Sequence, residues 1–247
     1  MSVGPESCPC PPPGRALATL LLVPPALLLI WWVLFSILLV GTLRWMDPPT
    51  TAFMTRHAQV LRQLGQPPPY FRHRWTPWPE LSPAIKLAAI AGEDQRFPDH
   101  SGFDLAQIRR AWAEYRQSGR RRGASTITQQ TAKNLFLWPG QDWRRKALEA
   151  WFALLMELLW PKERILEVYL NSVQFAPGVY GVGAASWRYF NRPPSDLTLE
   201  EAALMIGALP SPGLYRLDRP SAGLERRAAW IRDQAARLGG LAYLKRL

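Results

Sequence analysis

The sequence predicts a mainly α-helical domain behind one membrane-spanning helix. Residues 17–43 contain no charged residue. After them, the alternation of apolar and polar residues that marks strands is nearly absent. Several helix starts are recognisable, such as Ser82 before Pro83 and Thr198 three residues before Glu201. We therefore expect helices through most of the domain, and we find no internal repeat.

The membrane-spanning helix is predicted over residues 16–43. About 20 apolar residues are needed to cross a hydrocarbon core of about 30 Å, and this run is long enough although Pro24 and Pro25 interrupt its first half. A cleaved signal peptide is the alternative, but its apolar region would span only about 7–15 residues. The tryptophans that suit a membrane interface are Trp31, Trp32 and Trp45.

The segments on either side of this helix are rich in proline. Residues 1–15 are expected to form a disordered tail. Their Cys8 and Cys10 have no distant partner, which is poor evidence for a zinc site. Residues 44–80 are expected to form a membrane-proximal stalk with some short helix.

Regular structure is predicted from residue 81 onward, with a main domain over residues 81–222 and a C-terminal helix within residues 223–247. The predicted helices cover residues 83–93, 105–116, 141–160, 161–171, 184–190, 198–209 and 224–238. A further helix is predicted to open at Ser125 or Thr126 and to run to residue 136. Residues 173–182 contain Pro177, Gly178 and Gly181, and we expect a loop there.

The net charge of +11 points to an anionic partner. A basic domain held at a membrane suits anionic headgroups or a phosphate-bearing lipid. Nucleic acid is the other usual partner, but the chain lacks zinc-finger spacing, an RNA-binding aromatic motif and a basic zipper, so none is expected. The most basic stretch, Arg109 to Arg122, is either a solvated face or a contact with lipid phosphates.

Two stretches carry residues that suit chemistry on a sugar, namely residues 93–104 (EDQRFPDHSGFD) and 123–130 (GASTITQQ). Hydroxyls and amides match the hydrogen-bonding edges of a sugar. Glu93 follows an apolar run, and partial desolvation there would raise its pKa toward a range useful for proton transfer. The alternative is a helix-end carboxylate paired with Arg96. For His100, a structural hydrogen bond is the favoured interpretation over a base or a ligand.

Cations surround a second candidate carboxylate, Glu149. Arg145 and Lys146 precede it by four and three residues, on one side of the predicted helix. This arrangement at the edge of an apolar stripe is costly unless it serves a function. The alternative is a surface ion pair worth about 0–1 kcal/mol.

Lys133 is a candidate phosphate contact. Only five of the 30 Lys and Arg residues are lysines, and a compact ammonium makes a good point contact to phosphate. Helical spacing places Ser125, Gln129 and Lys133 on one face and Thr126, Gln130 and Asn134 on the next. The alternative is a solvated amide face.

Five ordered motifs give the chain a resemblance to peptidoglycan glycosyltransferases. EDQRFPDHSGFD resembles the family's first signature, GASTITQQTAKNLFL the second and RRKALEA the third. KERILEVYLN resembles the fourth, and RYFNRPPSDLTLEEAALMIGALPSP the fifth. Together they span roughly residues 81–220. The chain departs from the pattern at residues 173–176 and at Asn191, where glycine is usual, which leaves the local loop geometry open.

The resemblance implies a lysozyme-like, mainly α domain with a head lobe and a membrane-touching jaw lobe, after the single transmembrane helix. It implies a monofunctional enzyme, since the chain ends soon after the fifth motif without a transpeptidase domain. The family joins lipid II units to a growing lipid-linked glycan through β-1,4 bonds, with inversion and release of undecaprenyl pyrophosphate. We expect a single-pass protein of the bacterial inner membrane with its domain on the periplasmic side. Other cell-wall synthesis and division proteins are candidate partners.

The resemblance also gives roles to residues. Glu93 would be the general base, and Glu149 a second essential carboxylate on the donor side. The implied pyrophosphate contacts are Lys133, Arg145 and Lys146. Further implied substrate-binding residues are Asp94, Phe97, His100, Gly102, Ser125, Thr126, Gln129, Gln130 and Asn134. No dedicated metal cage is recognised, although a divalent cation, magnesium or manganese, could bridge the pyrophosphate to a carboxylate. A glycan-cleaving lysozyme-like enzyme and an inactive membrane scaffold are the alternatives.

Overall fold

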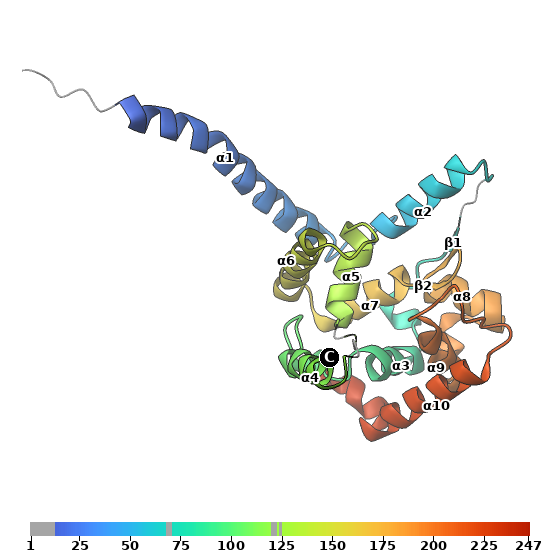
Figure 1. The fold of residues 1–247 in the computed structure, drawn as a ribbon. Coiled ribbons are helices and arrows are strands. Elements are labelled where there is room, and N and C mark those ends of the chain that lie inside the picture. The colour runs from blue at the N-terminus through green and yellow to red at the C-terminus, as the bar shows by residue number, and fades with distance from the viewer. Residues whose placement is uncertain (1–12, 68–70, 120–122, 124) are drawn as a thin grey trace, which may run out of the picture.

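The computed structural model describes residues 13–67, 71–119, 123 and 125–247, with side chains from residue 25 onward (Figure 1). Most of the expected disordered tail, residues 1–15, therefore lies outside the described residues, as do Arg120 to Arg122 of the basic stretch. Within the described part, the mainly α prediction is confirmed.

The α-helices are α1 (Pro13–Thr42), α2 (Ala52–Gln63), α3 (Pro83–Glu93), α4 (Leu105–Ser118), α5 (Ile127–Phe136), α6 (Trp143–Leu159), α7 (Lys162–Ser172), α8 (Gly181–Phe190), α9 (Leu199–Ala208) and α10 (Ala222–Arg237). Short 3-10 helices are η1 (Trp78–Glu80), η2 (Phe97–Asp99), η3 (Pro194–Asp196) and η4 (Gly240–Arg246). The strands are β1 (Arg72–His73), β2 (Gln174–Ala176) and β3 (Val179–Tyr180).

Local capping explains where several of these helices begin. The Ser82 hydroxyl accepts a hydrogen bond from the backbone N–H of Ile85 (3.2 Å), which starts α3 at its predicted position. Thr198 and Glu201 form the predicted capping box of α9. Thr126 and Gln129 form a second capping box at the start of α5, so Thr126 rather than Ser125 caps that helix.

The first helix, α1, is long and apolar enough to cross a membrane. Its window Pro25–Thr42 has a mean hydropathy of 2.2, and little of it is buried by the rest of the chain. Figure 1 shows α1 projecting away from the other helices and meeting them at α6.

Seven of the remaining α-helices form two groups. In one, α5 packs against α6 and α7, and α2 lies against α5. In the other, α3, α9 and α10 pack against one another. Figure 1 shows the first group beside the end of α1 and the second on the far side. Helix α7 contributes an almost continuous buried stretch to the core, since Arg164 to Ser172 are all buried.

The loop expected over residues 173–182 was wrong in part. Strands β2 and β3 pair antiparallel around Pro177 and Gly178, and β1 pairs parallel to β3. Gly178 has a φ of 71°, which suits the turn between the strands. The strands have only two or three residues each, so no alternating pattern could reveal them. Helix α8 also begins at Gly181, earlier than the predicted 184.

Asn191 ends α8 in the left-handed region, with φ 52° and ψ 41°. Glycine is favoured there because it has no Cβ, and asparagine is the residue that most often replaces it. The exchange of glycine for asparagine therefore keeps the turn after α8.

Gly183→Ala should destabilise the protein. Alanine usually stabilises a helix relative to glycine by about 0.5–1 kcal/mol, but a Cβ at Gly183 would overlap the Arg74 carbonyl oxygen and the Thr76 hydroxyl. Such overpacking costs about 1–3 kcal/mol. Gly223→Ala in α10 is the matched control, because its Cβ meets only an ordinary contact. Chemical denaturation should show a loss for Gly183→Ala and none for the control, and a gain at position 183 would contradict the packing described.

Candidate active site

A cleft of about 600 Å³ lies between the two groups of helices. The end of α3 and the loop after it form one wall, and α4, α5 and α10 supply the others. The polar and charged residues that line it are Glu93, Asp94, Gln95, Arg96, Gln107, Arg110, Ser125, Gln130, Lys133 and Arg227. The cleft thus brings together residues from both stretches that the sequence singled out.

Glu93 is a largely buried carboxylate on the cleft wall. Its side chain is 13% exposed, and its Oε1 lies 3.5 Å from a guanidinium nitrogen of Arg227. Its Oε2 accepts a hydrogen bond from Gln130 Nε2 (3.0 Å). Burial raises the pKa of Glu93, while the Gln130 hydrogen bond and the Arg227 charge oppose that rise. The expected pairing with Arg96 is wrong, because Arg96 donates to Asp104 instead (3.1 Å).

One Glu93 oxygen has room for a further hydrogen bond. Within the described residues, Oε1 is buried and accepts no hydrogen bond. A buried acceptor without a donor is unfavourable in the empty site. A hydroxyl that reached this oxygen would supply the missing donor.

Arg227 is a site residue that sequence reasoning missed. It comes from α10, which was expected to be a separate C-terminal helix, yet α10 packs against α3 and α9 and closes one side of the cleft. Trp230 of the same helix and Arg110 of α4 also line the cleft. Arg110 belongs to the most basic stretch of the sequence, which was already a candidate contact with lipid phosphates. No local signal distinguishes Arg227 from its neighbour Arg226.

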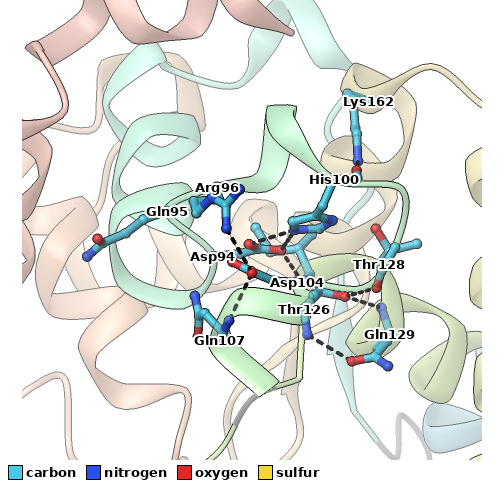
Figure 2. A network of polar contacts seen from close by, with 12 residues as sticks. Asp94, Gln95, Arg96, His100, Asp104, Gln107, Thr126, Thr128, Gln129 and Lys162 are labelled. Carbon is cyan, nitrogen blue, oxygen red and sulfur yellow. Dashed lines mark hydrogen bonds and ion pairs between the residues drawn. The ribbon is translucent and has the colours of Figure 1, made fainter. Parts of the chain in front are cut away.

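Asp94 fastens the end of α3 to the start of α5 (Figure 2). Its carboxylate is 1% exposed and lies 2.9 and 3.0 Å from His100 Nε2. It also accepts a hydrogen bond from the backbone N–H of Ile127 (3.0 Å). A negative charge at a helix N-terminus is favourable. The structural hydrogen bond expected for His100 is confirmed.

The same network holds the loop between α3 and α4 (Figure 2). The Thr126 hydroxyl donates to the Gly102 carbonyl (2.7 Å), and Lys162 Nζ donates to the His100 carbonyl (2.6 Å). Gly102 has a φ of 82°, which favours glycine. Phe97 is fully buried beneath the Lys162 ammonium. These contacts fix the loop that follows Glu93.

The structure separates the expected substrate-binding residues into two sets. Those that line the cleft are Asp94, Ser125, Gln130 and Lys133. Those that lie in the buried scaffold beside it are Phe97, His100, Gly102, Thr126, Gln129 and Asn134. The side chain of Gln129 takes part in the capping box of α5 and does not line the cleft, since its oxygen accepts a hydrogen bond from the Thr126 N–H (3.1 Å).

Glu149 forms the second charged cluster, with Arg145 and Lys146. Its side chain is 3% exposed; it lies 2.7 Å from Arg145 Nη1 and accepts a hydrogen bond from Lys146 Nζ. Arg145 is buried, whereas Lys146 is half exposed. The alternative of a surface ion pair is therefore wrong. Its two close contacts hold both cations in place.

Lys133 interacts electrostatically with both Glu93 and Glu149. Burial lowers its pKa, Arg145 and Lys146 lower it further, and Glu149 and Glu93 oppose the change. Its ammonium also lies 5.7 Å from the ring centre of Phe53 in α2. A phosphate arriving beside Lys133, Arg145 and Lys146 would find three positive groups in a partly desolvated place.

No group of three or more His, Cys, Asp or Glu side chains in the described part of the chain could hold a metal ion.

Comparisons with known proteins agree with the motifs. A family model described as "Transglycosylase" matches residues 58–236. A "Biosynthetic peptidoglycan transglycosylase" of Ectopseudomonas mendocina is 48% identical over 215 residues, which cover 87% of this chain and 88% of that protein. The protein of the same name from Pseudomonas entomophila is 49% identical over 212 residues, covering 86% and 89%.

Stability should depend on pH through Glu93. Because its folded-state pKa is raised, its stabilising contribution is present below the unfolded value and is lost as pH rises through the folded value. Wild type should therefore lose stability relative to Glu93→Gln as pH rises from about 4 to 8. Denaturation of both proteins in detergent across this range measures the difference. Glu80→Gln, at an exposed position, is the control, and a pH-independent difference for Glu93→Gln would refute the buried carboxylate.

Proposed function

The chain belongs to the transglycosylase family and is a peptidoglycan glycosyltransferase, and we propose that it polymerises lipid II into β-1,4-linked glycan strands. The donor is the growing glycan on undecaprenyl pyrophosphate, and the acceptor is the 4-hydroxyl of the N-acetylglucosamine of lipid II. The acceptor oxygen attacks the anomeric carbon with inversion. The bond from that carbon to the pyrophosphate breaks, and the electron pair leaves with the lipid pyrophosphate.

Glu93 is the general base in this proposal, and its environment is the observation that carries it. Burial raises its pKa, which moves the carboxylate toward the range in which a base both stays ionised and accepts a proton. Gln130 fixes one carboxylate oxygen, and the other is buried beside Arg227 without a hydrogen-bond donor among the described residues. The proton of the attacking hydroxyl passes to that oxygen.

The cluster around Glu149 supports a donor site for the pyrophosphate. Charge builds on the leaving phosphate as the bond breaks, and fixed cations stabilise it. Lys133, Arg145 and Lys146 supply these cations, and Glu149 holds the latter two in position. Arg110 and Arg227 line the cleft on the Glu93 side, where they suit the pyrophosphate of the acceptor lipid.

These cations also weigh against the two alternatives. A glycan-cleaving enzyme releases no pyrophosphate, so it would have no use for three cations beside the second carboxylate. An inactive scaffold would not need a desolvated Glu93 next to a cleft. Incubation of the detergent-solubilised protein with labelled lipid II or with finished glycan separates the three, because only the proposed function produces polymer from lipid II.

The lipid substrates imply a membrane setting. The apolar helix α1 suggests membrane anchoring. We place it in the bacterial inner membrane, with the domain on the periplasmic side where the glycan is assembled. Helix α4 supports contact with lipid headgroups, because it exposes apolar side chains next to basic ones: Leu105, Ile108, Arg109, Trp112 and Arg116. The other proposed partners are cell-wall synthesis and division proteins.

Glu93→Gln should nearly abolish polymerisation while the protein stays folded. The amide keeps the shape of the side chain and removes the base, and loss of a general base costs about 10²–10⁴-fold in rate. Initial rates on lipid II and a thermal unfolding curve measure the two effects, with Glu80→Gln as the control. Activity within a few fold of wild type would remove Glu93 from the mechanism.

Lys133→Ala should lower the rate more than Lys146→Ala. Loss of one preorganised electrostatic group costs about 10²–10³-fold, and Lys133 is the more buried of the two, so water screens its charge less. Lys245→Ala, at an exposed position in η4, should leave the rate unchanged. Initial rates on lipid II and unfolding curves for all three variants show whether each lysine acts in the reaction or in folding. If stability falls in step with the rate at position 133, this lysine is structural.

A further inference from the structure

The end of α1 is built into the domain by hydrogen bonds from two tryptophans. Trp160 Nε1 donates to the Val40 carbonyl (2.8 Å), and Trp151 Nε1 donates to the Ser36 hydroxyl (3.1 Å). Ser36 and Val40 are 1% and 0% exposed, whereas Leu28, two turns earlier, is 69% exposed. Only the last turns of α1 are therefore covered, and α6 and the residue after it cover them.

Two arginines cap helix ends across this junction. Arg44, just after α1, donates to the Leu159 carbonyl at the end of α6 (2.7 Å). Arg164 of α7 donates to the Leu43 carbonyl through two nitrogens (3.2 and 3.1 Å) and to the Met46 carbonyl (2.8 Å). The last carbonyls of a helix lack partners within it and carry the negative end of its dipole. Each arginine thus satisfies carbonyls at or just beyond a neighbouring helix.

Arg164 has more partners than these carbonyls. Its Nη1 lies 2.8 Å from Asp47 and 2.8 Å from Glu167, and its side chain is only 10% exposed. A planar guanidinium with five donors can serve all these acceptors at once, whereas the single nitrogen of lysine cannot. Burying this charge is costly unless every partner stays in place. The position of residues 43–47 is therefore fixed by the same side chain that lies in the core.

From Arg164 the connection continues into the core of the domain. Glu167 accepts a hydrogen bond from the Trp78 N–H (2.8 Å), and Asn171 pairs with the Thr76 backbone through both N–H and C=O (2.8 and 2.9 Å). Helix α7 packs directly against α5, which carries Gln130 and Lys133. The end of the membrane helix and the cleft are thus joined through two packed helices.

We propose that Arg164 is a positioning residue that fastens α1 to the domain, so that the two move as one body and the cleft keeps a fixed height and tilt above the bilayer. A flexible tether would need none of the contacts at Ser36, Val40 and Leu43. The fixed height matters because both lipid substrates enter the cleft from the membrane. This inference goes beyond the proposed function, which requires only that the domain be held near the bilayer.

A distance measurement on the full chain tests the proposal without relying on activity. Spin labels are placed at Leu28→Cys in α1 and Ala229→Cys in α10, both exposed positions, with Cys8 and Cys10 changed to Ser. The protein is reconstituted in vesicles of phosphatidylethanolamine and phosphatidylglycerol. Pulsed electron paramagnetic resonance should give a narrow distance distribution for the otherwise wild-type chain. A broad distribution there would by itself overturn the proposal.

Variants then show whether Arg164 is responsible. Arg164→Ala should broaden the distribution, and Arg164→Lys, which keeps the charge, should broaden it less and leave the domain melting temperature closer to wild type. Arg237→Ala, which removes an exposed ion pair in α10, is the matched control and should change neither quantity. If Arg164→Ala does not fold, Arg164→Lys decides. A folded Arg164 variant with the wild-type distribution would overturn the role of this residue.

A second route loosens the junction from the side of α1. Ser36→Ala combined with Trp160→Phe removes the two hydrogen bonds from the tryptophans to α1, together with the Ser36 bond to the Val33 carbonyl within α1, and keeps most of the packing. It should broaden the distribution, whereas Trp45→Phe, at an exposed tryptophan, should not. An unchanged distribution in the double variant would contradict the rigid junction.

Activity supplies a readout that rests on the proposed function. The Arg164 variants should raise the KM for lipid II in vesicles with little change in kcat, because a tilted domain meets its membrane-bound substrate less often while the catalytic groups are intact. A clear fall in kcat in detergent micelles, where no bilayer orients the domain, would instead indicate damage to the cleft and would overturn the positioning role. If wild type makes no polymer, the proposed function fails, and the distance measurements still decide this inference.

Discussion

The position of the cleft depends on the buried carboxylate of Asp94. It accepts hydrogen bonds from His100 and from the first turn of α5, so it joins the end of α3, the loop after it and the start of the helix that carries Gln130. Glu93 is the neighbouring residue in the chain. Its position is therefore set by the contacts that its neighbour makes. A buried charge with all its donors present is rigid because any movement leaves it unpaired.

The two glutamates of the site show how environment assigns different chemistry to the same side chain. Glu149 is buried beside two cations and holds them in place. Glu93 is buried with one amide donor and a more distant guanidinium, so its pKa is raised. The raised pKa of Glu93 favours the exchange of a proton, whereas the close cations make Glu149 a group that orders its neighbours. Lys133, which interacts electrostatically with both, links the two environments.

The sequence predicted what local rules decide. Serine before proline at residues 82–83 and the Thr198–Glu201 capping box fix helix starts through contacts within four residues. The charged spacing around Glu149 is local in the same sense. Arg227, the β2–β3 hairpin and the contacts of Arg164 were not predicted, because each depends on segments far apart in the chain or on strands too short for a pattern. The predicted boundary between residues 222 and 223 likewise separated residues that line one cleft, because the packing of α10 against α3 and α9 joins segments far apart in the chain.

Motif residues therefore lie at two distances from the cleft. Glu93, Gln130 and Lys133 line the cleft, while Phe97, Gly102 and Thr126 hold the loop and the helix start behind it. A motif read only as a list of binding residues would assign all of them the same role. Burial separates them: a side chain fully enclosed by its own fold can change a reaction only by moving a neighbour. The same reasoning extends to Arg164, which touches neither substrate nor cleft, yet joins the membrane helix to the core that positions both carboxylates.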